Sequence, residues 1–514
     1  MKKTILTLIL PCMLLTAKAQ EYLCIGDYWY GNSYIPVEQI ESITFGELKE
    51  ALLPELMDMD ENIKLFNEAL KLTGMRDSLM GLYDNNYLFE DELVTSIYGR
   101  DKAYALQKLR KGYTAFVETD KTYALYGIYT IEDLKAYAAR VYDAVYPEDA
   151  SVTDPTNRRN SLNRFVSYHL LDRSAAFNEL TAAGISNQQA GNVKERYNRN
   201  LIDIADWYET MMPQSILKCS SPLMSGGEHV FINRRGLKDG ADDRGVLVQG
   251  AQVIRDMPVI NRTLNGWYHY ISDIIAYDKQ TQEVVLDEQI LVNNSTISPE
   301  FMNNKMRVDN PFPQINSDNA VFLPKGSLKN VQVNNDETRM YYLFNKSWND
   351  VQADEFMILG NFDITIKLPP VPAGTYELNL GFSASPARHV VACYLDEAFC
   401  DTIDLRMTGD RLGWQSDKQL GSPEAIAEND QHLFNQGYRK GLPYYYCGSR
   451  YDSSTPMRDN DYSLRRIITT FTTDGKSDHY LRIKSANIDD DGTAQFMMDF
   501  LELCPTHLLN EYEQ

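Results

Sequence analysis

The residues with the most evident chemistry lie near the C-terminal end of the chain. Asn487, Asp489 and Asp491 alternate along the sequence and precede Gly492, as in the first half of a loop that binds Ca²⁺ through oxygen ligands. The twelfth position, where such a loop needs a bidentate glutamate, is Met498. The sequence therefore favours an Asp-rich hairpin turn. If Ca²⁺ binds, other loops must complete the site, and no further cofactor is indicated.

A second group of residues could stack on the rings of a sugar. Aromatic faces bind sugar rings, and polar neighbours bind the hydroxyl groups. The candidates are Trp348, Trp414, Tyr444, Tyr445 and Tyr446, with Asn349, Asp350 and Arg411 nearby in sequence. The competing interpretation, which is favoured, is that these rings fill the interior of the domain. Leu412–Gly448 is expected to be a long loop of the kind that carries binding residues.

No catalytic residue can be named. The chain has no Gly-x-Ser-x-Gly, His-Glu-x-x-His or phosphate-loop motif, and its seven histidines lack metal-ligand spacing. Acidic pairs occur, but 72 acidic residues make chance pairs inevitable. The chain is therefore expected not to be an enzyme.

Length and charge narrow the class of protein. A chain of 514 residues is expected to form two or three domains, and 43% hydrophobic residues suffice for their cores. The formal net charge of −22 argues against nucleic acid as a partner and against electrostatic binding to anionic lipid.

The N-terminal segment predicts export. Met1–Ala19 has the pattern of a secretory signal, with the apolar run Ile5–Leu15 before an Ala-Lys-Ala cleavage site. A lipid anchor at Cys12 is the alternative, and Pro11 disfavours it. No later stretch reaches the roughly 18–20 apolar residues that span a bilayer. The expected location is secreted, periplasmic or at the cell surface.

Export would permit disulfide bonds. The cysteines beyond the signal are Cys24, Cys219, Cys393, Cys400, Cys447 and Cys504. None forms a Cys-x-x-Cys pair, and the sequence does not determine which of them are joined.

The first half of the chain alternates between strand and helix patterns. Residues 20–45 are expected to form one or two strands, a lead-in similar to that of exported Bacteroidota proteins. Glu61–Met80 predicts a helix with a stop or kink at Gly74, and Thr130 begins another with a capping-box pattern. A further helix is expected over Val193–Met211, inside a surface insertion spanning Thr181–Glu228.

Ser161–Leu171 predicts a helix with a single apolar stripe. Leu162, Phe165, Val166 and His169 follow helical spacing, so His169 is expected to satisfy a hydrogen bond inside the core. Tyr168 precedes it directly.

Two other segments belong with Ser161–Leu171 in the comparison that follows. Lys111–Tyr123 contains Phe116 followed by Thr119 and Asp120, which is similar to the short strand and threonine-aspartate turn of the first fasciclin (FAS1) signature. Further on, Asn265-Gly266 predicts a turn between two strands, followed by His269 and Asp273.

Together these segments resemble the signatures of the fasciclin (FAS1) domain, in the family's order, over Ile63–Asp278. The resemblance implies an α+β fold, a β-sandwich with flanking helices. In animal members the tyrosine-histidine pair, here Tyr168 and His169, is linked to cell adhesion. Glu118 departs from the family pattern, which has a proline before the threonine.

The last part of the chain has an all-β pattern typical of a β-sandwich or jelly roll. The expected strands are Phe362–Leu368, Tyr376–Phe382, His389–Leu395, Ile467–Thr473, His479–Ile483 and Phe496–Leu503. Pro372–Tyr376 and Met498–Leu503 resemble galactose-binding-like and carbohydrate-binding modules.

The resulting organisation has five parts. We expect a signal over 1–19, lead-in strands over 20–60, a fasciclin-like domain over 61–278, an excursion from that domain that ends as a linker over 279–330, and a β-sandwich over 331–514. The expected function is adhesion or ligand binding outside the cell, toward a glycan, matrix or another surface protein. The alternatives are an enzyme acting on polysaccharide with the sandwich as its accessory module, or a structural subunit of a surface complex.

Overall fold

The computed structural model describes residues 22–27, 31–36, 51–90, 93–95, 102–182, 202–224, 228–236, 248–255, 262–307, 320–344, 350–446, 455–486 and 495–509. The chain divides into two compact units, Met1–Lys49 and Glu50–Gln514. In the first unit, β1 (Tyr22–Asp27) pairs antiparallel with β2 (Gly31–Pro36). The expected signal, with Cys12, lies outside the described residues. Among those described, no helix has the length and apolar character needed to cross a membrane.

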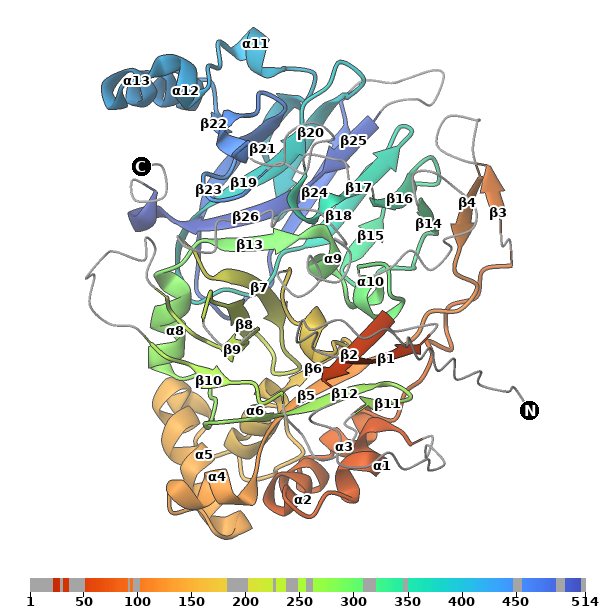
Figure 1. The fold of residues 1–514 in the computed structure, drawn as a ribbon, viewed down its shortest axis with the longest axis vertical. Coiled ribbons are helices and arrows are strands. Elements are labelled where there is room, and N and C mark those ends of the chain that lie inside the picture. The colour runs from red at the N-terminus through yellow and green to blue at the C-terminus, as the bar shows by residue number, and fades with distance from the viewer. Residues whose placement is uncertain are drawn as a thin grey trace, which may run out of the picture. The chain divides into compact units, whose positions relative to one another are not determined.

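The second unit mixes helices with strands, and its described strands form five sheets (Figure 1). Its helices are α1 (Leu53–Asp58), α2 (Lys64–Leu72), α3 (Met75–Ser78), α4 (Asp120–Leu125), α5 (Ile131–Val145), α6 (Ser161–Tyr168), α8 (Lys279–Leu286), α9 (Asn294–Ile297), α10 (Pro299–Asn303), α11 (Gly409–Leu412), α12 (Asp417–Leu420) and α13 (Pro423–Phe434). The fold class is therefore mixed α/β with several sheets.

One sheet joins the beginning and end of the region that resembles a fasciclin domain. Its order is β11 (Arg262–Thr263), β12 (Gly266–Ile271), β5 (Tyr113–Glu118) and β6 (Leu170–Leu171), and β12 runs parallel to β5. Gly266 has φ +151°, and a Cβ there would lie 1.9 Å from Tyr113 O, so only glycine fits. The turn itself is Leu264-Asn265, one residue earlier than the sequence predicts.

Helices pack together beside this sheet, and their ends follow the predicted signals. Thr130 caps α5 by accepting from Asp133 N, and Asp133 in turn accepts from Thr130 N. Gly74, at φ +69°, separates α2 from α3. Helix α5 packs against α2 and α6.

The predicted helix over Val193–Met211 is wrong where the structure describes it. Residues 204–209 form β7 (Ile204–Glu209), in a sheet with β8 (Ile216–Ser221), β9 (Phe231–Ile232) and β10 (Ala251–Gln252). Trp207 and Tyr208 are buried there, and every residue of β8 is buried. The segment belongs to the core, and the expected surface insertion over Thr181–Glu228 is wrong for these strands.

Three further sheets come mostly from the last third of the chain. The first has the order β13 (Ile290–Asn293), β26 (Phe500–Pro505), β19 (Gly374–Ser383), β23 (Ser463–Thr473) and β22 (Tyr438–Lys440). The second runs β15 (Val331–Val333), β18 (Asp363–Lys367), β24 (Tyr480–Ser485), β20 (Val390–Leu395) and β21 (Ala398–Asp404). Each segment predicted as a strand here lies in one of these sheets or in the next.

The third of these sheets spans distant parts of the chain. Its order is β25 (Gln495–Met498), β17 (Asp354–Leu359), β16 (Arg339–Phe344), β14 (Val321–Leu323), β4 (Lys102–Ala105) and β3 (Leu93–Thr95). The division at residues 279 and 330 stays a prediction, and β13, β14 and β4 pair with strands across it.

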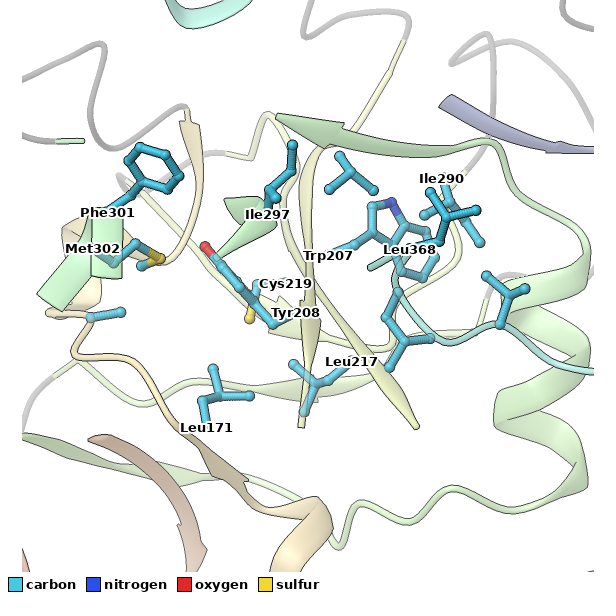
Figure 2. Packing of buried hydrophobic residues seen from close by; sticks show 14 of the residues in the cluster. Leu171, Trp207, Tyr208, Leu217, Cys219, Ile290, Ile297, Phe301, Met302 and Leu368 are labelled. Carbon is cyan, nitrogen blue, oxygen red and sulfur yellow. The ribbon is translucent and has the colours of Figure 1, made fainter. Parts of the chain in front are cut away.

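Buried side chains also connect the residues before position 330 with those after it. A single apolar cluster contains residues from both, and Figure 2 shows some of its members: Leu171, Trp207, Tyr208, Leu217, Ile290, Ile297, Phe301 and Leu368. Removing residues 331–514 would therefore expose apolar surface of the preceding part of the chain, at a cost of about 25 cal/mol per Å².

The expected long loop Leu412–Gly448 contains regular structure over its described residues 412–446, which corrects that prediction. It contains α12, α13 and the strand β22. Ser416 and Ser422 cap the two helices, and Gly421 ends α12 in the left-handed region at φ +74°. These local signals support helices although the apolar pattern is weak.

Candidate ligand-binding site

The structure separates the predicted site residues into three groups. Trp348 and the calcium candidates Asn487, Asp489 and Asp491 lie outside the described residues. Trp414 and the tyrosines 444–446 are described and half-buried. Tyr168 and His169 are fully buried.

The tyrosine-histidine pair belongs to the core. Tyr168 OH donates to Ile216 O at 3.3 Å and accepts from Asn233 Nδ2 at 2.9 Å. His169 Nδ1 donates to Phe165 O at 2.7 Å. Neither side chain reaches the surface, so a direct contact between them and an external partner is ruled out in this conformation.

Trp414 is held by main-chain contacts of the helical insertion between β21 and β22. The main-chain N–H of Trp414 donates to Gly409 O at 2.9 Å. Asn429 on α13 accepts from Gln415 N at 3.2 Å and donates to Gly413 O at 2.9 Å, which fixes the turn on both sides of the tryptophan. The ring packs partly against the main apolar cluster. Its buried Nε1 has no hydrogen-bond partner among the described residues.

Lys440 lies over the Trp414 ring and belongs to a group of four charged side chains, which we call the charged quartet: Asp417, Asp430, Lys440 and Arg458. Lys440 Nζ lies 5.9 Å from the centre of the indole ring, 2.8 Å from Asp417 Oδ1 and 3.5 Å from Asp430 Oδ1. Arg458 Nε lies 2.5 Å from Asp417 Oδ2, and its guanidinium also pairs with Asp430.

Burial differs between the two signs of charge in the quartet. The Lys440 side chain is 0% exposed and that of Arg458 9%, whereas Asp417 and Asp430 are 26% and 20% exposed. Burial alone would lower the pKa of Arg458, but Asp430 and Asp417 hold it above its usual value. The buried cations thus fix two carboxylates whose outer edges reach solvent.

Short elements from distant positions build the quartet. Asp417 lies on α12, Asp430 on α13 and Lys440 on β22, and Arg458 comes from the turn Met457–Asp459. Asp417 N also donates to Asp459 Oδ1 at 2.8 Å. Asp417 and Arg458 are 41 positions apart, so the quartet does not correspond to any short sequence motif.

Tyr445 and Tyr446 contact the turn that carries Arg458. Tyr445 O accepts from Met457 N at 2.7 Å, one residue before Arg458, and Tyr446 forms a β-bridge with Pro456. The Tyr445 ring packs against small apolar clusters that include Leu442 and Ile204. Tyr445 therefore has a packing role, whereas the ring of Trp414 lies by Lys440 of the quartet.

A buried acidic group was not singled out from the sequence as a site. Asp350, Glu355 and Asp499 are each about nine-tenths buried or more. Burial, and then the neighbouring Asp350, raises the pKa of Glu355 well above its usual value. Glu355 is hydrogen-bonded to Asp350, which requires one of the two to be protonated. The one sequence signal is that Asp499 interrupts the apolar run 496–501, whereas Glu355 stands directly before the apolar run 356–359.

Metal ligation finds no support among the described residues. No group of three histidine, cysteine, aspartate or glutamate side chains within them is arranged to hold a metal ion. The predicted loop 487–492 falls outside this set, so its calcium site stays a prediction.

Comparisons with known proteins leave the family open. No protein-family model matches the chain, and no curated protein matches it. Solved structures that share some similarity include a Paenibacillus xanthan lyase, at 8% identity and a TM-score of 0.21, with 65% of this chain and 27% of that chain covered. Another is an exo-β-1,3-galactanase from Phanerochaete chrysosporium with β-1,3-galactotriose, at 8% identity and a TM-score of 0.17, with 56% and 54% covered. This chain thus spans about a quarter to a half of those proteins, and likeness at this level carries no argument.

Proposed function

We propose that this chain is an exported ligand-binding protein that takes a neutral glycan at Trp414 and the charged quartet. The observation that carries the proposal is a half-buried tryptophan whose ring lies by the buried Lys440, which together with Arg458 holds two partly exposed carboxylates. An aromatic face can stack on a sugar ring, and carboxylate oxygens accept hydrogen bonds from its hydroxyl groups. Main-chain contacts and the quartet fix the position of both in advance, which lowers the entropic cost of binding.

Charge favours a neutral sugar over an acidic one. The quartet contains two positive and two negative side chains, and its cations are buried while its carboxylates reach solvent. The whole chain carries a formal charge of −22. An anionic ligand would meet carboxylates first, so a neutral polyhydroxylated ligand is the better fit.

The fold proposed for this protein is a fasciclin-like part combined with a β-sandwich of the carbohydrate-module type. Support for the first is the parallel pairing of β5 with β12, which brings the first and last fasciclin-like segments into one sheet beside the buried Tyr168-His169 pair. Support for the second is the two antiparallel five-stranded sheets of the C-terminal part, which share one apolar core.

A glycan-array screen of the full chain, followed by titration calorimetry on any sugar that binds, tests the proposal. We expect Trp414→Ala to weaken binding by at least about tenfold, or about 1.4 kcal/mol. Phe399→Ala is the matched control, because Phe399 is 60% exposed on β21 and its ring contacts Tyr394, so its loss should leave binding unchanged.

Two results would overturn this assignment. If the Trp414→Ala variant unfolds normally and still binds the glycan as the wild type does, Trp414 is not part of the binding site. Failure of the wild-type protein to bind any neutral glycan would remove the ligand class and favour a structural role in a surface complex.

A second candidate function is cleavage of polysaccharide, favoured by the Glu355–Asp350 pair. A protonated glutamate beside an acidic neighbour is the arrangement a glycosidase uses for its general acid. Release of reducing ends from polysaccharides by the wild-type protein, abolished by Glu355→Gln, would establish this activity. If neither the wild type nor the Glu355→Gln variant releases sugar from polysaccharides that it binds, the buried acidic group around Glu355 has a structural role.

A further inference from the structure

The hairpin of β20 and β21 contains an irregularity next to two cysteines. Asp396 and Glu397 form its turn, with φ 49° and 64°. Two cross-strand pairs follow in regular register, Leu395 with Ala398 and Tyr394 with Phe399. The register then shifts by one, so that Cys393 pairs with Asp401 and Cys400 is the extra residue of a β-bulge.

This bulge places Cys400 across from Cys393. In the register set by the turn, Cys400 would be the direct partner of Cys393, and in the bulge Cys400 and Asp401 together face it. Directly opposed residues of antiparallel strands have Cα atoms about 4.5–5.5 Å apart. A disulfide bond joins Cα atoms that are about 4.4–6.8 Å apart. The backbone therefore has the spacing that a disulfide needs.

Burial and electrostatics put the two thiols in one environment. Both are free thiols in the structure. Cys393 is fully buried in the main apolar cluster, and Cys400 is half-buried and packs against that cluster. Burial, and then the neighbouring Cys400, raise the pKa of Cys393 to about 12. Cys400 is the thiol that an external reagent reaches first.

We propose that Cys393 and Cys400 form an oxidative cross-link when the folded protein meets a small-molecule disulfide or the disulfide of an exported thiol oxidase. Cys400 thiolate attacks one sulfur atom of the oxidant, the oxidant's S–S bond breaks, and one thiolate leaves. Cys393 then gives up its proton, attacks the sulfur of Cys400 and expels the second thiolate. Two protein thiols are oxidised, the oxidant disulfide is reduced to two thiols, and the two protons pass to them.

The cross-link would secure an exposed boundary of the sandwich. Strand β21 is the edge strand of its sheet and pairs only with β20 among the described strands. An edge strand can detach or pair with another chain. A covalent bond across the bulge would keep β21 in place outside the cell, where disulfides persist.

Peptide mapping of the purified full chain tests the proposal. The protein is incubated folded with oxidised glutathione, denatured, alkylated, and digested with trypsin and a glutamate-specific protease. Cleavage after Glu397 separates Cys393 from Cys400, which otherwise share the tryptic peptide 389–406. We expect the two halves to stay joined, without alkyl groups, until a reductant is added.

Single variants identify the order of the two steps. Cys393→Ser should leave Cys400 carrying one stable glutathione, whereas Cys400→Ser should leave the buried Cys393 unmodified. Cys219→Ser is the matched control, because Cys219 is a buried thiol on β8 in another sheet, and the joined peptides should persist.

The wild-type map alone is enough to reject the proposal. Full alkylation of both cysteines after oxidation would overturn it. So would a wild-type protein in which Cys400 carries glutathione while Cys393 stays reduced.

Discussion

His169 Nε2 lies 2.8 Å from Glu118 Oε1, and both side chains are fully buried. The second oxygen of Glu118 accepts from Tyr123 OH at 2.8 Å. Glu118 is the residue that departs from the fasciclin pattern, which has a proline there. In this chain the departure supplies the buried histidine with its partner, so the two residues act as one structural unit.

Breaking this unit should destabilise the protein strongly. Truncating either partner leaves a buried polar group without its partner, which typically costs about 3–5 kcal/mol. We expect Glu118→Ala and His169→Ala each to lower the unfolding free energy by about that amount, and the double variant to lose clearly less than the sum of the two. Denaturant unfolding of the four proteins measures this.

A partly exposed histidine–aspartate pair provides the control. His479 Nδ1 lies 2.7 Å from Asp396 Oδ2, and the Asp396 side chain is 43% exposed. His479→Ala should cost less than about 1 kcal/mol. Additive losses at Glu118 and His169 would show that they do not form one unit.

Local features of the fold could be predicted from the sequence, but its long-range pairings could not. The Thr130 capping box and the helix that ends at Tyr168 were predicted because the residues that set them lie within a few positions of each other. The strand β7 was missed because its pairing with β8 overrides a segment pattern that reads as a helix.

The same distinction applies to the candidate site. Trp414 could be nominated because a tryptophan in a segment rich in glycine and aromatic residues is a visible signal. Lys440 and Arg458 could not, because their partner Asp417 lies 23 and 41 positions away, and only the packing of α12 and β22 against the turn Met457–Asp459 brings the three together.

Asp354 should make stability fall as the pH rises. It is fully buried, accepts from Tyr342 OH at 2.7 Å, and has its pKa raised from 3.8 to about 7, mainly by burial. The native state therefore holds this proton more tightly than the unfolded state. Its contribution is complete below about pH 4 and is lost as the pH rises to 7, by up to about 4 kcal/mol.

The variant Asp354→Asn isolates that contribution. Between pH 4 and 7 the wild type should lose stability relative to this variant. The difference between their unfolding free energies should therefore grow over that range and stay constant above pH 7. Asp363→Asn is the control, because pairing with Arg482 lowers the pKa of Asp363 against the effect of burial. Its stabilisation is lost only as the pH falls below about 4. A flat difference for Asp354→Asn would contradict the assignment.

His269 should produce the opposite trend over an overlapping range. Burial lowers its pKa from 6.5 to about 4, and Nε2 donates to Ala175 O at 2.9 Å. The unfolded state binds the proton first as the pH falls, so the wild type should lose up to about 3 kcal/mol between pH 6.5 and 4. His269→Gln should remove this loss, seen as a shallower fall in its thermal midpoint on acidification. An equally steep fall in the variant would show that His269 is not the source.

Strand sharing between the two halves predicts how fragments behave. A fragment that begins at Val331 lacks β13, β14 and β4, so it leaves the edge of β16 unpaired and one side of β26 open. Unpaired edges and uncovered apolar surface promote association. We expect this fragment to aggregate or to unfold without a cooperative transition, whereas a fragment that begins at Lys279 restores β13 and β14 and should be more soluble. Size-exclusion chromatography with thermal unfolding compares them, and a monomeric 331–514 fragment with a sharp transition would show that this part of the chain folds on its own.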